Sequence, residues 1–111
     1  MSQAFEIIGD DPCRIRIALD AGRKVHFEPL GTSSSKKNVA IGSFTCSVEE
    51  AANVTAGHPL VLKSADGEFS ANCLDGQVLL RYSIANRSFS QDCVIDADLY
   101  DEATIRAFLS L

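Results

Sequence analysis

Basic side chains in the first third of the chain are the residues whose types and spacing best fit binding chemistry. Apolar and polar residues alternate over residues 13–19, so Arg14 and Arg16 share one face of a strand. A partner strand after a hairpin puts Lys24 and His26 on that face, and the loop over residues 31–37 can close over it. Guanidinium, ammonium and hydroxyl donors bind phosphate groups. The pattern predicts an anion site for a phosphate-bearing small molecule, or alternatively a solvated basic face, at Arg14, Arg16, Lys24, His26, Lys36 and Lys37.

Acidic residues gather near the C-terminus, where residues 88–102 contain five acids and no base. Oppositely charged patches favour docking of proteins, so this segment is a candidate surface for a basic protein partner. The alternative is helix capping, because Asp98 is a good N-cap and acids in the first turn favour the positive end of a helix. The candidate docking residues are Asp92, Asp96, Asp98, Asp101 and Glu102.

No motif in the sequence indicates catalysis or metal binding. The only histidines are His26, on an outer strand face, and His58, in a Gly-His-Pro turn. No serine or cysteine stands in a nucleophile signature, and no histidine or cysteine pair has metal-ligand spacing. We therefore predict a non-enzymatic protein with no metal and no cofactor.

Charge and hydropathy limit the partners and the location. The net charge is −5, which argues against nucleic-acid binding. No apolar run approaches the roughly 18 to 20 residues that span a bilayer, and residues 1–4 do not resemble a signal peptide. We expect a cytoplasmic protein that binds neither nucleic acid nor membrane, and that contacts a protein partner or a second copy of itself.

The four cysteines are Cys13, Cys46, Cys73 and Cys93, and none lies in a C-x-x-C pair. Cys73 and Cys93 share one face of a predicted sheet with a strand between them, which separates them by about 10 Å, too far for a disulfide. All four are interpreted as small buried thiols in a reducing cytoplasm.

The first half of the chain reads as short strands and one short helix. Strands are expected over residues 4–8, 13–19 and 23–28, with the loop Asp20-Ala21-Gly22 closing a hairpin that sets Ile17 opposite Val25. A fourth strand is expected over residues 39–48, with a bend at Gly42 where the apolar phase changes. The run from Ser47 to Glu50 resembles a capping box for a helix that ends near Val54.

The second half reads as a four-stranded meander from Leu60 to Leu99. Its turns are expected at Asp66-Gly67, Asp75-Gly76 and Asn86-Arg87. These turns put the apolar residues on one face, with Gln91 and Ser64 as the polar exceptions. They leave a mixed face that carries Lys63, Glu68, Ser70, Asn72, Arg81, Ser83 and Asp92 together with Val61, Leu79 and Val94.

Together these elements predict one mainly β domain over residues 1–111. It has about eight antiparallel strands as two meander sheets in a partly open barrel, with a short mid-chain helix and a C-terminal capping helix. Leu99, Ala103, Ala107 and Leu111 form the apolar stripe of that last helix.

The order of elements over residues 42–111 resembles a PilZ domain, with a strand, a short helical segment, a glycine at Gly57, the meander and a helix that begins at Asp98. PilZ domains typically bind cyclic di-GMP through R-x-x-x-R and [D/N]-x-S-x-x-G segments. Here Arg14 and Arg16 have a different spacing, and Ser47 stands without the flanking acid and glycine. The resemblance implies a degenerate PilZ-like module that acts through protein contacts. A pleckstrin-homology-like barrel, which also ends in a helix, is the alternative fold analogy.

The function expected from the sequence is therefore a small non-enzymatic binding or regulatory module that acts through protein–protein contacts. The alternatives are an acidic inhibitor or immunity-type protein with a basic partner, and a structural subunit of a phage or secretion apparatus.

Overall fold

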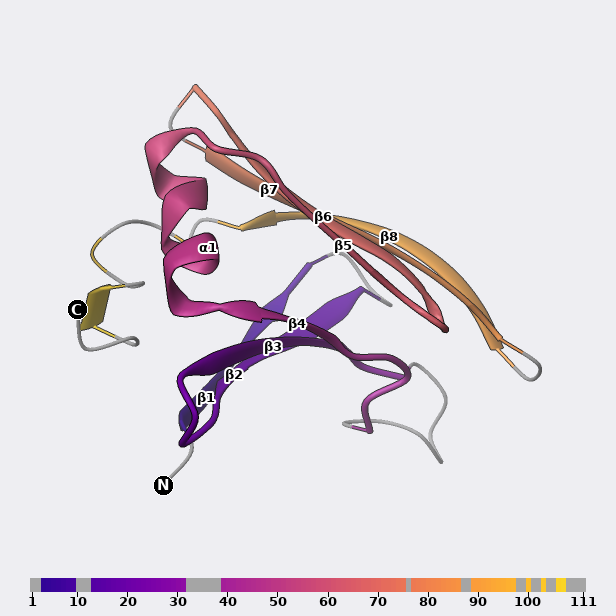
Figure 1. Ribbon diagram of the computed structural model, residues 1–111. Helices are drawn as coiled ribbons and strands as arrows, with labels where there is room; N and C mark the ends of the chain where they lie inside the picture. The colour runs from indigo at the N-terminus through magenta and orange to yellow at the C-terminus, as the bar shows by residue number, and fades with distance from the viewer. Residues whose placement is uncertain are drawn as a thin grey trace.

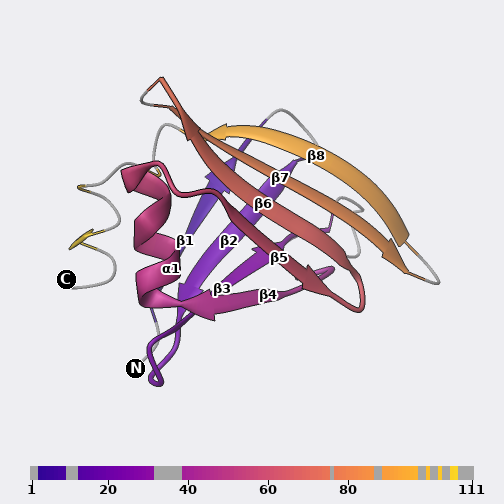
Figure 2. The same cartoon turned by 45° about the horizontal axis from the view of Figure 1, so that its top comes forward.

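The computed structural model shows a mainly β protein made of two antiparallel sheets. It describes residues 3–9, 13–31, 39–75, 77–86, 89–97, 100, 103 and 106–107, with the backbone alone at residues 3, 86 and 89. The sheets lie as two layers with the helix α1 at one end of both (Figure 1). The strands of one sheet run across those of the other when the molecule is tilted (Figure 2).

The first half of the chain forms one sheet and the second half forms the other. The N-terminal sheet has the order β1 (Gln3–Ile8), β2 (Arg14–Leu19), β3 (Lys24–Pro29) and β4 (Phe44–Ser47). The C-terminal sheet has the order β5 (Leu60–Ser64), β6 (Gly67–Leu74), β7 (Gln77–Asn86) and β8 (Phe89–Ala97). The sheets share no strand and do not close into a barrel, so the predicted pair of meander sheets in a partly open arrangement is confirmed.

The helix α1 (Val48–Asn53) and the 3₁₀ turn η1 (Val54–Ala56) connect the sheets. The Ser47 hydroxyl accepts from the Glu50 amide, and the Glu50 carboxylate accepts from the Ser47 amide, which is the predicted capping box. Gly57 ends the segment in the left-handed region, where glycine carries no steric cost.

The core lies between the inner faces of the two sheets. The Phe27 ring from the N-terminal sheet stacks on the Phe69 ring from the C-terminal sheet at a centroid distance of 4.4 Å. Phe44 contacts the same ring at 5.9 Å. Tyr100 is fully buried near Phe27, and its hydroxyl donates to the Ala51 carbonyl of α1 over 3.1 Å. These contacts hold the sheets and the helix together.

The turns expected from the sequence set Leu62 opposite Ala71, Phe69 opposite Tyr82 and Leu80 opposite Cys93, and the C-terminal sheet follows these registers only in part. The β6–β7 pairing is confirmed, with Phe69 opposite Tyr82. In the flanking hairpins the partners differ by two residues, so Leu62 faces Phe69 and Tyr82 faces Cys93. A shift of two leaves each side chain on its predicted face, because the strand period is two. The buried amide of Gln91, on the inner face as expected, donates to the Tyr82 hydroxyl over 2.6 Å.

The shift between β5 and β6 has a visible cause at Gly67. Ser64 pairs with Gly67, so the turn residues are Ala65 and Asp66, and Gly67 belongs to the strand. Its φ is 155°, and a Cβ at this position would collide with the Ser83 carbonyl oxygen of β7. The glycine is therefore needed for close approach of two strands, and not for the turn itself.

In the first hairpin, the strand partners are also shifted by two residues from those expected. Its loop is Ala21 to Arg23, one residue later than predicted, and Ile17 therefore faces Phe27. Arg23 takes the left-handed conformation, with φ 60°, in place of Gly22. The Asp20 carboxylate holds this loop by accepting from the amides of Gly22 and Lys24, at 2.8 and 3.0 Å.

The strand expected over residues 39–48 is shorter. Only β4 pairs as a strand, and Ala40 makes an isolated bridge with Leu30. Gly42 lies where a Cβ would come within 2.7 Å of Ile84 Cδ1. The change of apolar phase therefore marks the place where the chain packs on the opposite sheet.

The prediction of four free thiols is wrong for one pair. Cys13 and Cys93 form a disulfide with a Cα–Cα distance of 5.6 Å, joining the start of β2 to β8 across the core. Cys46 and Cys73 are free. A disulfide is typical of oxidising environments, so these two cysteines do not support the expected reducing environment, and the cytoplasmic location stays a prediction.

Most of the predicted C-terminal helix, including Asp98, Asp101 and Glu102, lies outside the described residues, although Ala103, Arg106 and Ala107 have helical backbone. Among the described residues, no helix is both long and apolar enough to cross a membrane.

Candidate functional site

The predicted basic face exists on the outer side of the N-terminal sheet, but its arginines are already paired. Arg14 donates to the Glu6 carboxylate over 2.8 Å, and Arg16 donates to Glu28 over 3.0 Å. Lys24 is exposed at the other end of β3, beside the β2–β3 loop, whereas Lys36 and Lys37 lie outside the described residues. The anion site stays a prediction, and two of its cations carry neutralising carboxylates on the same face.

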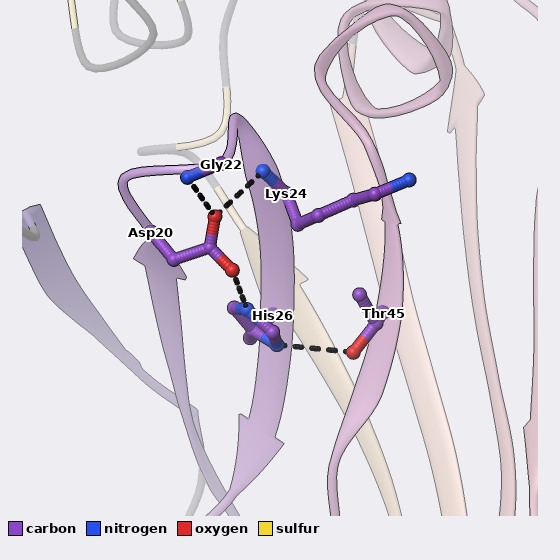
Figure 3. A network of polar contacts seen from close by, with 5 residues as sticks. All are labelled: Asp20, Gly22, Lys24, His26 and Thr45. Carbon is purple, nitrogen blue, oxygen red and sulfur yellow. Dashed lines mark hydrogen bonds and ion pairs between the residues drawn. The ribbon is translucent and has the colours of Figure 1, made fainter.

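His26 takes part in a polar network with two neighbours on this face (Figure 3). Its Nε2 lies 2.7 Å from Asp20 Oδ2, and its Nδ1 lies 3.0 Å from Thr45 Oγ1. An ionised carboxylate only accepts, so Nε2 donates to Asp20. These bonds lower the pKa of Asp20, with the His26 bond as the largest cause and the Lys24 amide next. The network fixes the β2–β3 loop against β4. The Lys24 side chain points away from Asp20 and His26, so only the Lys24 backbone amide takes part in the network (Figure 3).

The predicted acidic docking surface is described only in part. Asp92 and Asp96 are exposed on the outer face of β8, and the remaining three acids lie outside the described residues. Asp92 is not a free anion, because its Oδ1 accepts from the Ser83 hydroxyl of β7 over 2.5 Å. Docking through these acids stays a prediction.

A groove of about 390 Å³ on the outer face of the C-terminal sheet is the feature that the sequence did not single out as a site. We call it the sheet groove. Its lining comes from β5, β6 and β7, namely Lys63, Ser64, Gly67, Glu68, Ser70, Arg81, Ser83 and Ala85.

Strand pairing places five of these residues, Lys63, Glu68, Ser70, Arg81 and Ser83, in two adjacent rows across the sheet. One row runs Lys63, Glu68, Ser83, Asp92, and the next runs Val61, Ser70, Arg81, Val94. Neighbouring strands lie about 4.8 Å apart and alternate residues about 7 Å apart. Lys63 and Arg81 therefore stand on opposite sides of β6, diagonally across the groove.

Lys63 and Arg81 are the available cations of the sheet groove. Both are exposed, and within the described chain no ion pair joins either of them to a carboxylate. The lining residues alone hold two cations and one anion, Glu68, a charge of +1. Asp92 at the β8 end of one row brings the two rows to zero, against −5 for the whole chain. Ser70 adds a hydroxyl, so the groove offers ammonium, guanidinium and hydroxyl donors to an anionic ligand.

The thiol of Cys46 and the phenol of Tyr82 are buried in the core and do not line the sheet groove. Burial raises the pKa of Cys46 to about 12 and also raises the pKa of Tyr82. A thiol with such a pKa stays protonated and inert. Among the residues that the structure describes, no group of three or more histidine, cysteine or acidic side chains could hold a metal ion.

Comparison with known proteins identifies the fold and no family. No family model and no curated protein matches the sequence, so the PilZ resemblance stays a prediction. Solved structures with this fold include MRP1/MRP2 of Trypanosoma brucei, with a TM-score of 0.69, 12% identity, and coverage of 99% of this chain and 83% of that chain. Another is a guide-RNA-binding protein complex bound to a gRNA, with a TM-score of 0.66, 9% identity, and coverage of 99% and 88%.

The exclusion of nucleic acid drawn from net charge is therefore wrong. The same fold, over nearly the whole chain, occurs in a protein complex bound to a guide RNA. Net charge failed as a criterion because it sums over all faces, whereas a phosphate senses only the charges within a Debye length of about 8 to 10 Å.

Proposed function

We propose that this chain is a small non-enzymatic binding module for RNA, which contacts the phosphate backbone in the sheet groove. The observation that carries the proposal is the pair Lys63 and Arg81, exposed without carboxylate partners in a groove that also presents the Ser70 hydroxyl. The likeness of the fold to a guide-RNA-binding complex supports it, and the proposal extends that complex's ligand to this chain by analogy.

The sheet groove is a better phosphate site than the basic face of the N-terminal sheet. Arg14 and Arg16 would have to give up their bonds to Glu6 and Glu28, or bring those carboxylates close to a phosphate. Lys63 and Arg81 have no ion pair among the described residues, so binding of a phosphate breaks none. Because phosphate contacts supply most non-specific affinity, the unpaired cations should dominate binding.

The number of phosphate contacts determines the salt dependence. Each neutralised phosphate on a single strand contributes about −0.7 to the slope of log K against log salt concentration. Two contacts therefore give a slope of about −1.4, with a dissociation constant in the range of about 10⁻⁴ to 10⁻⁶ M at physiological salt.

Fluorescence anisotropy with a labelled oligouridylate, measured from low to physiological salt, tests the proposal. Lys63→Gln and Arg81→Gln should each weaken binding and reduce the steepness of the salt slope by about 0.7. Arg16→Gln is the matched control, because it removes one exposed-face cation that is already paired with Glu28. A slope that changes in Arg16→Gln and not in the groove variants would refute the assignment of the site.

A protein partner is a second candidate function. Val61 and Val94 are 56% and 49% exposed at the two ends of one groove row, and Asp92 and Asp96 flank Val94. Apolar side chains between acids fit a basic protein surface. Titration with a lysine-rich peptide should then show binding that Asp96→Asn and Val94→Ser both weaken; no binding by the unmodified chain would count against this function.

A further inference from the structure

The hydrogen-bonding polarity of the sheet groove points to a preference for RNA over DNA. We propose that Ser83 Oγ accepts a hydrogen bond from the ribose 2′-hydroxyl, and that Asp92 positions Ser83 for this task. The inference rests on the proposed function, and it adds a specificity-determining residue to it.

The bond between Ser83 and Asp92 determines what Ser83 can do. The Ser83 hydroxyl lies 2.5 Å from Asp92 Oδ1, within the range of charge-assisted O–H···O⁻ bonds. A carboxylate has no hydrogen to give, so Ser83 is the donor. Its single hydrogen points at Asp92, and only the oxygen lone pairs remain for a ligand.

A hydroxyl restricted in this way cannot bind a phosphate. Phosphate oxygens accept hydrogen bonds, and Ser83 has no hydrogen left to donate. Glu68 lies directly opposite Ser83 on β6, and its carboxylate likewise only accepts. The row that begins at Lys63 therefore contains three adjacent acceptors, Glu68, Ser83 and Asp92, which require a donor on the ligand.

Ser70 provides the contrast within the same groove. It lies on β6 opposite Arg81, and no hydrogen bond occupies its hydroxyl within the described chain. Ser70 can therefore donate to a phosphate beside Arg81. The groove thus has a donor side at Ser70 and Arg81, and an acceptor side at Glu68 and Ser83, about 7 Å along the strands.

A ribonucleotide satisfies both sides, because its phosphate accepts and its 2′-hydroxyl donates. Base N–H groups are donors too, but they are the same in RNA and DNA of matched base sequence. The 2′-hydroxyl is the donor that deoxyribose lacks, and it is the group by which proteins distinguish RNA from DNA at a given site.

The test compares binding of oligouridylate, oligodeoxyuridylate and 2′-fluoro-oligouridylate by anisotropy at one salt concentration. The fluorine keeps a small substituent at the 2′ position and removes the donor. The unmodified protein should bind the ribose oligomer roughly 2- to 12-fold more tightly than either of the others, the effect of one net hydrogen bond.

Single substitutions distinguish recognition of the 2′-hydroxyl from the general effect of removing a negative charge. Ser83→Ala should reduce the ratio of the two affinities to near one while leaving deoxy-oligomer binding unchanged. Asp92→Ala removes the bond that orients the Ser83 hydroxyl, so the hydroxyl can rotate and the ratio should fall as well. Asp96→Ala, a matched removal of an exposed acid from β8, should strengthen binding of both oligomers and leave the ratio unchanged. Ser70→Ala should weaken both equally.

The outcomes distinguish the two proposals. Equal affinity of the unmodified protein for the three oligomers, or a ratio that survives Ser83→Ala, overturns the role of Ser83 and leaves RNA binding intact. No measurable binding of any oligomer overturns the proposed function and this inference with it.

Discussion

Loss of the disulfide between Cys13 and Cys93 should lower the stability of the protein strongly. The bond closes a segment of 80 residues and connects the two sheets across the core. In the loop-entropy relation, 80 residues correspond to about 15 cal/mol/K, or about 4.5 kcal/mol at 25 °C. For a domain of this size, about 4 °C of melting temperature accompanies each kcal/mol, so full reduction should lower the melting temperature by about 15 to 20 °C.

Thermal unfolding followed by circular dichroism measures this effect. The protein is unfolded and refolded with or without a phosphine reductant before heating, so that the buried sulfurs are reached. Alkylation of the unfolded, unreduced protein should label two thiols, Cys46 and Cys73, and reduction should add two more.

Two variants control for general effects of the reductant. Cys73→Ser removes a free, half-buried thiol and should keep the full drop on reduction. The double variant Cys13→Ser, Cys93→Ser should have the melting temperature of the reduced unmodified protein, and the reductant should not change it. A drop of less than about 3 °C in the unmodified protein would show that the disulfide contributes little stability, and four thiols labelled before reduction would show that it does not form.

Three further perturbations follow from individual contacts. Tyr100→Phe removes the buried bond to the Ala51 carbonyl and should cost about 1 to 2 kcal/mol of unfolding free energy, measured by urea titration; no change would show that the hydroxyl contributes nothing. Asp20 has a lowered pKa, so its stabilising contribution is present above pH 3.8 and is lost as pH falls through the lower folded-state value. The difference in melting temperature between the unmodified protein and Asp20→Asn should therefore shrink below pH 3.8, and a constant difference would contradict the bond to His26. Gly67→Ala puts a Cβ against the Ser83 carbonyl, so it should destabilise the protein by more than about 1 kcal/mol and weaken RNA binding with it, whereas Gly22→Ala, in an open loop of ordinary φ, should do neither.

Alternation of apolar residues was sufficient to predict which side chains face the core, even where the partners were wrong. Ile17 and Cys93 lie on their predicted faces although the neighbouring hairpins are shifted by two residues. The error arose in the turns, where local bonds decide the closing pair. Asp20 accepts from two loop amides, and Gly67 is required within a strand.

The disulfide and the groove depend on contacts between distant parts of the chain. Cys13 and Cys93 were both placed on inner faces, but only the packing of one sheet on the other brings them together. Lys63, Arg81 and Ser83 were placed on one outer face, yet counting charges along the sequence gives no weight to cations on non-adjacent strands. A count of charges by strand row, once the registers are known, would have found them.

Mapping of amide chemical shifts tests RNA binding in the sheet groove most directly. On titration of the isotope-labelled protein with oligouridylate, we expect saturable shifts at Lys63, Ser70, Arg81 and Ser83, and little change at Arg14 and Arg16. Shifts confined to the outer face of the N-terminal sheet, or no shifts at saturating RNA, would contradict it.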